Sequence, residues 1–254
     1  MTRYYLGIDD TDVLGRKPGT GRLARELGAS LQADGLARLD GVVRQQLLVD
    51  PRIPYTSHNS PACLVLSIAD GDGGRVFDTA SRWVAARSAD GADPGVCLAE
   101  EWRVDEAVRA FGVRASIEVV TKGEALGLAE RTGLRLVELG GTGDGVIGAL
   151  AGVGLTAAGN AGRFLEYGDG LRDLGQAISA AALRARGIAV LNLARDAEWI
   201  PDQAPIHTGD RLRPRLLGGR PVLLVERGDD GWLAFDRKQP RVDGEGHGHG
   251  RDEG

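Results

Sequence analysis

The spacing of apolar residues predicts an alternation of strands and helices over most of this 254-residue chain. An apolar run over 3–8 predicts a strand, and leucines four positions apart (Leu23, Leu27 and Leu31) mark one face of a helix. Further extended runs are expected at 41–49, 62–68, 115–120, 134–139 and 163–167. Further helices are expected at 76–87, 104–111, 121–131 and 146–158. This alternation is typical of an α/β or α+β fold.

The last part of the chain has a different pattern. Extended runs are expected at 191–194, 221–226 and 232–235, and an Asp-Asp-Gly turn signal separates the last two. We therefore predict a small β appendage after Pro201. The residues after 237 are charged and glycine-rich, which favours disorder. His247 and His249 in that tail form only a weak candidate metal pair, because nothing fixes their positions.

Composition narrows the function classes. A chain with 42% hydrophobic and 26% charged residues is globular, and its length predicts two units. Its net charge of −5 disfavours RNA as a partner of the isolated chain, because polyanion binders usually carry a basic excess. Cys63 and Cys97 form no CxxC pair, so no zinc ribbon is encoded. Without a signal segment or an 18-residue apolar run, we expect a cytoplasmic protein with no membrane partner.

The first candidate site is the acidic turn Gly7-Ile8-Asp9-Asp10-Thr11-Asp12, which follows the first predicted strand. Three carboxylates within four positions repel one another unless a cation compensates their charge. Mg²⁺ prefers one or two carboxylates together with phosphate oxygens and water. Asp9, Asp10 and Asp12 are therefore candidate metal ligands, and Gly7 and Thr11 are candidate nucleotide contacts in the same turn.

The sequence Gly19-Thr20-Gly21 opens the helix that follows this turn. Glycines let backbone N–H groups approach phosphates, and the start of a helix favours an anion. Metal and phosphate would then meet at the carboxyl end of the first strand. The alternative is an ordinary junction, in which the aspartates make Asx turns and Thr20 caps the helix. The residues alone leave both interpretations open.

Two further segments carry candidate residues. The loop from Ile53 to Pro61 holds His58 and Asn59 as candidate phosphate contacts, or it is a solvated turn. The residues from Gly143 to Gly148 match the dinucleotide pattern GxGxxG, and Glu166 follows near the place of a ribose-binding acid. An NAD-dependent oxidoreductase is therefore an alternative. A Rossmann fold normally begins near the start of a chain, however, and 39 glycines make chance matches easy.

Two motifs in the same order resemble the archaeal tRNA-isoleucine 2-agmatinylcytidine synthetase family. The first is GIDDTD with the spaced Gly-Thr and Leu-Ala after it, and the second is GVIGALA at 145–151. The resemblance covers about residues 3–200. It implies a kinase-like domain over 1–110, a ferredoxin-like domain over 111–200, a small β appendage over 201–240 and a disordered tail over 241–254.

The resemblance implies ATP and Mg²⁺ as cofactors, with Asp9, Asp10 and Thr20 as catalytic residues. Thr20 would accept a phosphoryl group transiently, and backbone at Gly19, Gly21, Gly143 and Gly145 would contact the nucleotide. The family's Cys-Thr-Thr is Gly19-Thr20-Gly21 here, and its Lys-Thr-Arg-Gly-Asn loop is replaced by 56–60. The pattern shows no counterpart of the OB-fold and zinc ribbon that hold the family's tRNA. We predict an ATP-dependent kinase or ligase acting on RNA or a small molecule, with a non-catalytic nucleotide sensor as an open alternative.

Overall fold

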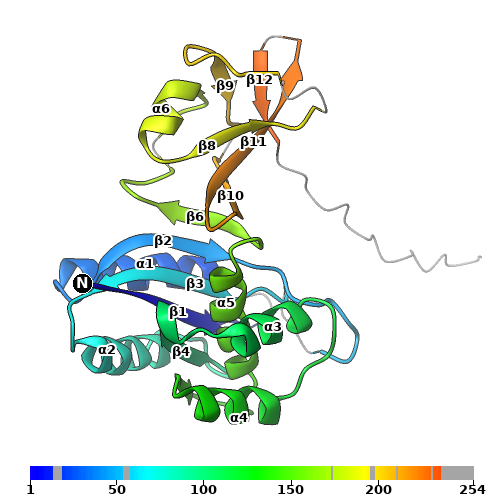
Figure 1. Cartoon of the computed structure of the whole chain (residues 1–254). Coiled ribbons are helices and arrows are strands. Elements are labelled where there is room, and N and C mark those ends of the chain that lie inside the picture. Colours follow the sequence, from blue (N-terminus) through cyan, green and yellow to red (C-terminus); the bar gives the residue numbers. More distant parts are fainter. Residues whose placement is uncertain are drawn as a thin grey trace, which may run out of the picture.

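The computed structural model describes residues 1–13, 19–53, 58–172, 174–194, 198–209, 211–229 and 231–235. The predicted mixed α/β fold is confirmed: helices cover both faces of a large sheet, which continues into a smaller β-rich unit (Figure 1). Among the described residues, none of the helices combines the length and apolar character needed to span a bilayer.

The first six elements form a ferredoxin-like arrangement. They are β1 (Thr2–Asp9), α1 (Thr20–Ala33), β2 (Arg38–Arg44), β3 (Ala62–Ile68), α2 (Gly73–Ala85) and β4 (Gly95–Glu100). The strand order is β4-β1-β3-β2 with antiparallel neighbours, which is the β-α-β-β-α-β pattern of that fold. This pattern occurs over 2–100, whereas the resemblance implied a ferredoxin-like domain over 111–200. The sequence prediction missed β4, the strand that completes it. The predicted domain boundaries themselves stay predictions.

Helices on both faces explain why every residue of β3 is buried. One face, with Leu6, Ile8 and Leu64, packs against α1 and α2. The other face, with Tyr5 and the free cysteines, packs against later helices. Those helices are α3 (Glu106–Ala115), α4 (Lys122–Thr132) and α5 (Gly145–Ala158), preceded by the short helix η1 (Glu101–Arg103). The sheet thus lies at the centre of three layers.

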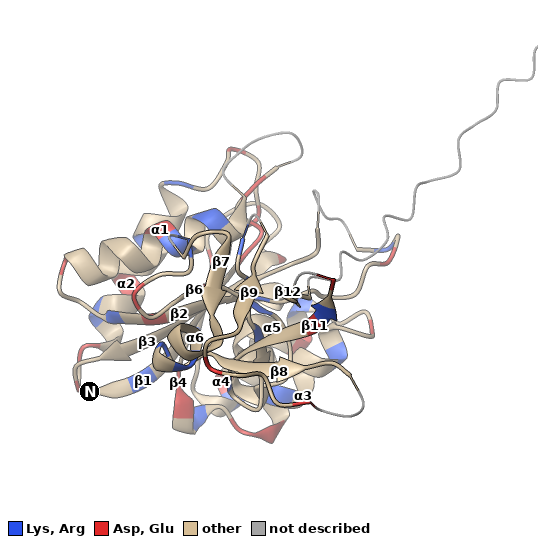
Figure 2. Ribbon diagram, turned by 90° about the horizontal axis from the view of Figure 1, so that it is seen from above, with Lys and Arg blue, Asp and Glu red and all other residues tan. Residues whose placement is uncertain are grey.

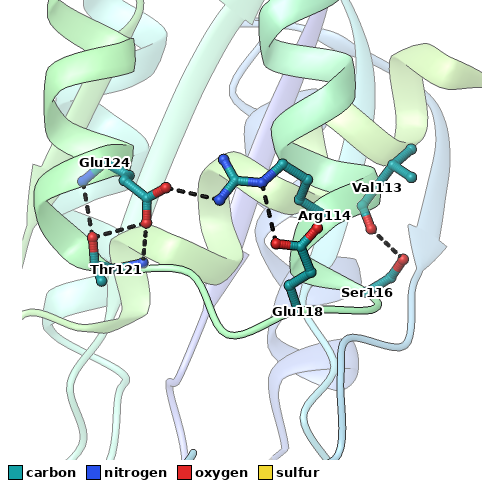
Figure 3. A network of polar contacts seen from close by, with 6 residues as sticks. All are labelled: Val113, Arg114, Ser116, Glu118, Thr121 and Glu124. Atoms are coloured by element: carbon teal, nitrogen blue, oxygen red, sulfur yellow. Dashed lines mark hydrogen bonds and ion pairs between the residues drawn. The ribbon is translucent and has the colours of Figure 1, made fainter.

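The junction of α3 and α4 corrects one prediction (Figure 3). Thr121 begins α4 with a capping box, in which its hydroxyl accepts from the Glu124 amide and the Glu124 carboxylate accepts from the Thr121 amide at 2.9 Å. Arg114 of α3 donates to the same carboxylate at 2.9 Å. Residues 115–120, predicted to be extended, instead end α3 and turn. The reason is that Ile117 and Val119 are exposed and pair with none of the described strands.

The remaining elements extend the sheet at both edges. β5 (Arg135–Glu138) pairs with β4, and β6 (Arg163–Tyr167) pairs with β2, both antiparallel. The chain continues through β7 (Ala177–Ser179), α6 (Ala180–Ala185), β8 (Ala189–Asn192), β9 (Pro205–His207), β10 (Arg215–Leu217), β11 (Arg220–Gly228) and β12 (Gly231–Ala234). From β6 the sheet runs on in the order β10-β11-β12-β9-β7, with β8 beside β11.

This C-terminal β unit has a further core cluster, which includes Phe164, Leu183, Ile206 and Trp232 and is joined by Val43 of β2. The β character predicted after Pro201 is therefore present, and strands from residue 163 onward also contribute. The predicted disordered tail over 241–254, with His247 and His249, lies outside the described residues.

Candidate active site

Close packing of β1 and β4 against α5 brings the two sequence motifs together. A Cβ atom on Gly7 would overlap the Ala149 carbonyl, and one on Gly148 would overlap the Asp9 carboxylate. Gly95 likewise meets the Gly145 backbone, and the Gly145 amide donates to the Asp93 carbonyl at 3.1 Å. The glycines therefore let the start of α5 lie directly on the strand ends. Asp9 is placed beside the first turns of that helix.

The two carboxylates at the end of β1 are held in an unfavourable setting. Burial raises the pKa of Asp9 to about 7, and the charges of Asp10 and Asp12 add to the shift. Burial also raises the pKa of Asp10 to about 6, followed by the charges of Asp93, Asp12 and Asp144. Asp10 adopts a φ of 52°, the one left-handed non-glycine residue of the described chain. A cation at this turn would relieve the repulsion.

Asp93 and Asp144 join the acidic turn from other elements, and the sequence analysis missed both. Asp93 precedes β4 and accepts hydrogen bonds from the Thr142 amide at 2.5 Å and the Thr142 hydroxyl at 2.9 Å. Asp144 is the residue before α5. The sequence feature that could have identified them is that each aspartate lies shortly before an apolar element that begins with glycine.

The carboxylates do not form a closed metal cage. Among the described residues, no group of three His, Cys, Asp or Glu side chains is arranged to hold a metal ion by itself. Mg²⁺ characteristically takes one or two carboxylates and completes its shell with phosphate oxygens and water. The assignment of Asp9, Asp10 and Asp12 as ligands therefore stays a prediction, and it requires a phosphate-bearing ligand.

The start of α1 lies next to this turn. Gly19 occupies the N-cap position without a side-chain hydrogen bond, and Thr20 is the first helical residue. A Cβ atom on Gly19 would lie 3.1 Å from an Asp12 carboxylate oxygen. The Thr11 hydroxyl donates to the Thr20 hydroxyl at 3.0 Å, and Thr20 is 7% exposed. The alternative in which Thr20 caps the helix is therefore wrong, because Gly19 holds that position.

Arg44, at the end of β2, supplies a cation that the sequence analysis missed. Burial lowers its pKa, whereas the charges of Asp9 and Asp12 raise it. His58 is within electrostatic reach of Arg44. Burial lowers the pKa of His58, and the Arg44 charge lowers it further. Asn59, in contrast, supports the loop, because its side-chain amide donates to the Leu48 carbonyl at 2.8 Å.

The GxGxxG segment lacks the surroundings of a dinucleotide site. It connects the antiparallel edge strand β5 to α5, whereas a Rossmann turn joins parallel strands through a helix. Gly143 has a φ of 78°, and a Cβ atom there would overlap the Glu138 carboxylate. Glu166 lies in β6 and accepts from the Leu171 amide at 3.0 Å. The observed context favours close packing over NAD binding.

The α/β fold and the two packed motifs resemble those of the synthetase family, as the sequence indicates. No family model matches the chain. The tRNA-isoleucine 2-agmatinylcytidine synthetase TiaS of Pyrococcus horikoshii is 31% identical over 156 residues, which make up 59% of this chain and 35% of that protein. The chain thus spans about a third of the length of this relative.

Solved structures of the synthetase agree with the sequence comparison. TiaS in complex with its isoleucine tRNA and ATP matches with a TM-score of 0.53 and 26% identity over 61% of this chain and 36% of that one. TiaS in complex with the same tRNA, AMPCPP and agmatine matches with a TM-score of 0.52 and 25% identity over 60% and 36%. The resemblance to this family is therefore confirmed. Because these relatives are complexes with tRNA, they give no support to our expectation that RNA is disfavoured.

Proposed function

We propose that this chain is a Mg²⁺-dependent, ATP-using enzyme of the kinase or ligase type that modifies RNA. The observation that carries the proposal is the packing of the acidic turn of β1 on the glycine-rich start of α5. This packing brings together the two motifs that resemble those of the synthetase family. The similarity to TiaS, whose complexes contain ATP and tRNA, supports the nucleotide and the RNA acceptor.

The donor set fits Mg²⁺ bound together with nucleotide phosphates. Asp9 and Asp10 are carboxylates disfavoured by burial and mutual repulsion, and Asp12 lies at the start of α1. When bound, the ion supplies charge neutralisation at the phosphates. Backbone at Gly19 and Gly21 can approach phosphate oxygens without steric hindrance from a side chain, whereas the Gly145 amide already donates to the Asp93 carbonyl. Thr11 and His58 complete the proposed nucleotide contacts, and Asn59 positions the loop beside them. Gly7 and Gly143 serve close packing instead, against the Ala149 carbonyl and the Glu138 carboxylate.

Thr20 is the proposed phosphoryl acceptor. In the transfer, a bond forms between Thr20 Oγ1 and the γ-phosphorus of ATP, and the bond to the bridging oxygen breaks. ADP leaves, and the hydroxyl proton passes to a carboxylate of the acidic turn. The hydrogen bond from Thr11 fixes the orientation of the acceptor, which lies at the amino end of α1 where a negative charge is stabilised. The phosphoryl group then passes from Thr20 Oγ1 to an oxygen of the RNA base: the new O–P bond activates the base for modification, the Thr20 O–P bond breaks, and the proton returns to the Thr20 hydroxyl.

The metal-dependent step is tested by calorimetry of ATP binding. We expect saturable ATP binding with Mg²⁺ and none in EDTA, and a loss of at least about tenfold in affinity for Asp9→Asn/Asp10→Asn. Asp34→Asn/Asp78→Asn is the matched control, because it removes two exposed carboxylates, one at the end of α1 and one on α2. Undiminished Mg²⁺–ATP affinity in the first variant would remove the acidic turn from the nucleotide site.

The transfer step is tested with ATP labelled at the γ-phosphate. Label should appear on the wild-type chain and on Thr20→Ser, which keeps the hydroxyl, but not on Thr20→Ala. ATP binding without label transfer or turnover in the wild type, measured with RNA present, would instead identify a nucleotide sensor.

A further inference from the structure

A row of arginines follows β9, in a chain whose net charge is −5. Arg211, Arg213 and Arg215 alternate with Leu212 and Pro214, which are buried. In an extended segment, alternate side chains point to the same side. The three arginines therefore face one way, while the residues between them fix the segment to the core of the C-terminal β unit.

Other arginines converge on the same region. Arg163 of β6 stands directly opposite Arg215 of β10, and like charges in directly opposed positions of an antiparallel pair are destabilising. On α1, burial and the charges of Arg172 and Arg211 lower the pKa of Arg25, whereas the charges of Glu166 and Glu26 raise it. We define the arginine track as Arg25, Arg44, Arg163, Arg172, Arg211, Arg213 and Arg215.

The track connects a large hollow with the acidic turn. The hollow has a volume of about 1410 Å³, lies between α1, β2, β6 and the start of β11, and is lined by Arg25 and Arg172. Four more arginines line its wall: Arg3, Arg38, Arg186 and Arg220. Arg38 pairs with Asp40 at 2.8 Å, and Arg3 pairs with Glu101 at 3.7 Å. Figure 2 colours Lys and Arg positions blue, including those on α1. At the other end of the track, the charges of Asp9, Asp12 and Arg213 all act on Arg44.

Four carboxylates also line the hollow: Glu26, Asp40, Glu166 and Asp169. Asp40 is the partner of Arg38, and the charges of Glu166 and Glu26 act on Arg25. Glu26 is engaged by Arg22 at 2.6 Å, and Glu166 accepts from the Leu171 amide at 3.0 Å. Small-molecule sites usually occupy about 300–1,000 Å³, so the hollow exceeds what one nucleotide needs. An elongated polyanion with regularly spaced charges fits both the volume and the row better.

We propose that the arginine track and the hollow hold the sugar–phosphate backbone of an RNA strand and lead it to the acidic turn. Guanidinium groups bind phosphates in a bidentate manner, and Tyr167 in the wall offers a ring for base stacking. The site is concave, so it fits an RNA strand better than it fits a flat anionic membrane surface. The proposal gives the RNA of the proposed function a location, but it rests on residues outside the ATP site.

The test is fluorescence anisotropy with a labelled, unstructured RNA of about 20 nucleotides, titrated with the full chain at several salt concentrations. Each phosphate contact on a single strand contributes about 0.7 to the slope of log affinity against log salt. Arg211→Gln/Arg213→Gln should therefore reduce the slope by about 1.4 and the affinity at least tenfold at low salt. Arg211→Lys/Arg213→Lys keeps both charges and should keep most of the slope.

Arg75→Gln/Arg131→Gln is the matched control, because it removes two exposed arginines from α2 and α4 and lowers the net charge equally. It should bind RNA within about twofold of the wild type. Equal weakening in the control, no RNA binding by the wild type, or binding to phosphatidylglycerol vesicles but not RNA would overturn the proposal. Mg²⁺–ATP affinity is measured on the same variants. Track-dependent RNA binding without ATP binding would leave this inference standing and overturn the proposed function.

Discussion

At the scale of single residues, the acidic turn combines two features that oppose folding. Asp10 has a left-handed backbone, and both Asp9 and Asp10 resist ionisation because they are buried near other carboxylates. Such strain persists where the surrounding structure enforces it, and it is concentrated at functional sites. The turn is therefore better explained as a cation and phosphate site than as a structural junction.

This electrostatic cost predicts a pH dependence of stability in the absence of metal. Asp9 has a folded pKa of about 7 against an ordinary value of 3.8, so the folded chain holds more protons than the unfolded chain between these values. Stability should consequently fall as the pH rises from about 4 to about 7. Melting in EDTA should show a steeper decline for the wild type than for Asp9→Asn/Asp10→Asn. At about pH 7.5, which is above both folded pKa values, the variant should have a higher melting temperature than the wild type. A lower melting temperature of the variant at that pH would contradict this account.

The sequence predicted this turn but not the residues that complete its surroundings. GIDDTD is contiguous, so its carboxylates are visible as a local pattern. Asp93, Asp144 and Arg44 come from separate elements, and only the sheet order places them beside Asp10 or Asp9. Thr20 illustrates the opposite case, because its position at the helix start was readable from the flanking glycines.

At the scale of elements, the contact of β1 with α5 depends on glycines. Gly7→Ala should destabilise the fold by about 1–3 kcal/mol, because the added methyl group would overlap the Ala149 carbonyl. Gly123→Ala, in α4, is the control, since a Cβ atom there meets nothing within 4 Å. It should stabilise the helix by up to about 1 kcal/mol. Urea unfolding measures both, and equal stability of Gly7→Ala would show that β1 and α5 are not in close contact.

The prediction of elements succeeded where periodicity was uninterrupted. The strand expected at 62–68 is β3, and the helix expected at 146–158 differs from α5 by one residue. β4 was missed because Gly, Asp and Pro precede it and obscure a short apolar run. The apolar residues of 115–120 suggested a strand, yet the capping box at Thr121 makes this segment a turn.

At the scale of the whole molecule, one sheet passes through two hydrophobic regions. The three-layer part packs two clusters on opposite faces of β1 and β3, whereas the C-terminal β unit has its own cluster. Sequence patterns could not show this division, because long-range strand pairing decides it. Residues before and after 110 share the cluster around Tyr5 and Phe111, so these residues are expected to unfold together.

The separate cores predict that the C-terminal β unit can be weakened without damage to the nucleotide site. Leu183 of α6 is fully buried in the C-terminal cluster, and Leu183→Ala should cost about 2–5 kcal/mol there. Hydrogen exchange should then accelerate in β8 and β11 but not in β1 and β3. Mg²⁺–ATP affinity should stay within about twofold of the wild type, while RNA affinity should fall because β10 carries part of the arginine track. Leu150→Ala in α5 is the converse control, since it removes a buried side chain beside the acidic turn. It should accelerate exchange in β1 and weaken ATP binding, and uniform acceleration in both variants would instead mean that the chain unfolds as one cooperative unit.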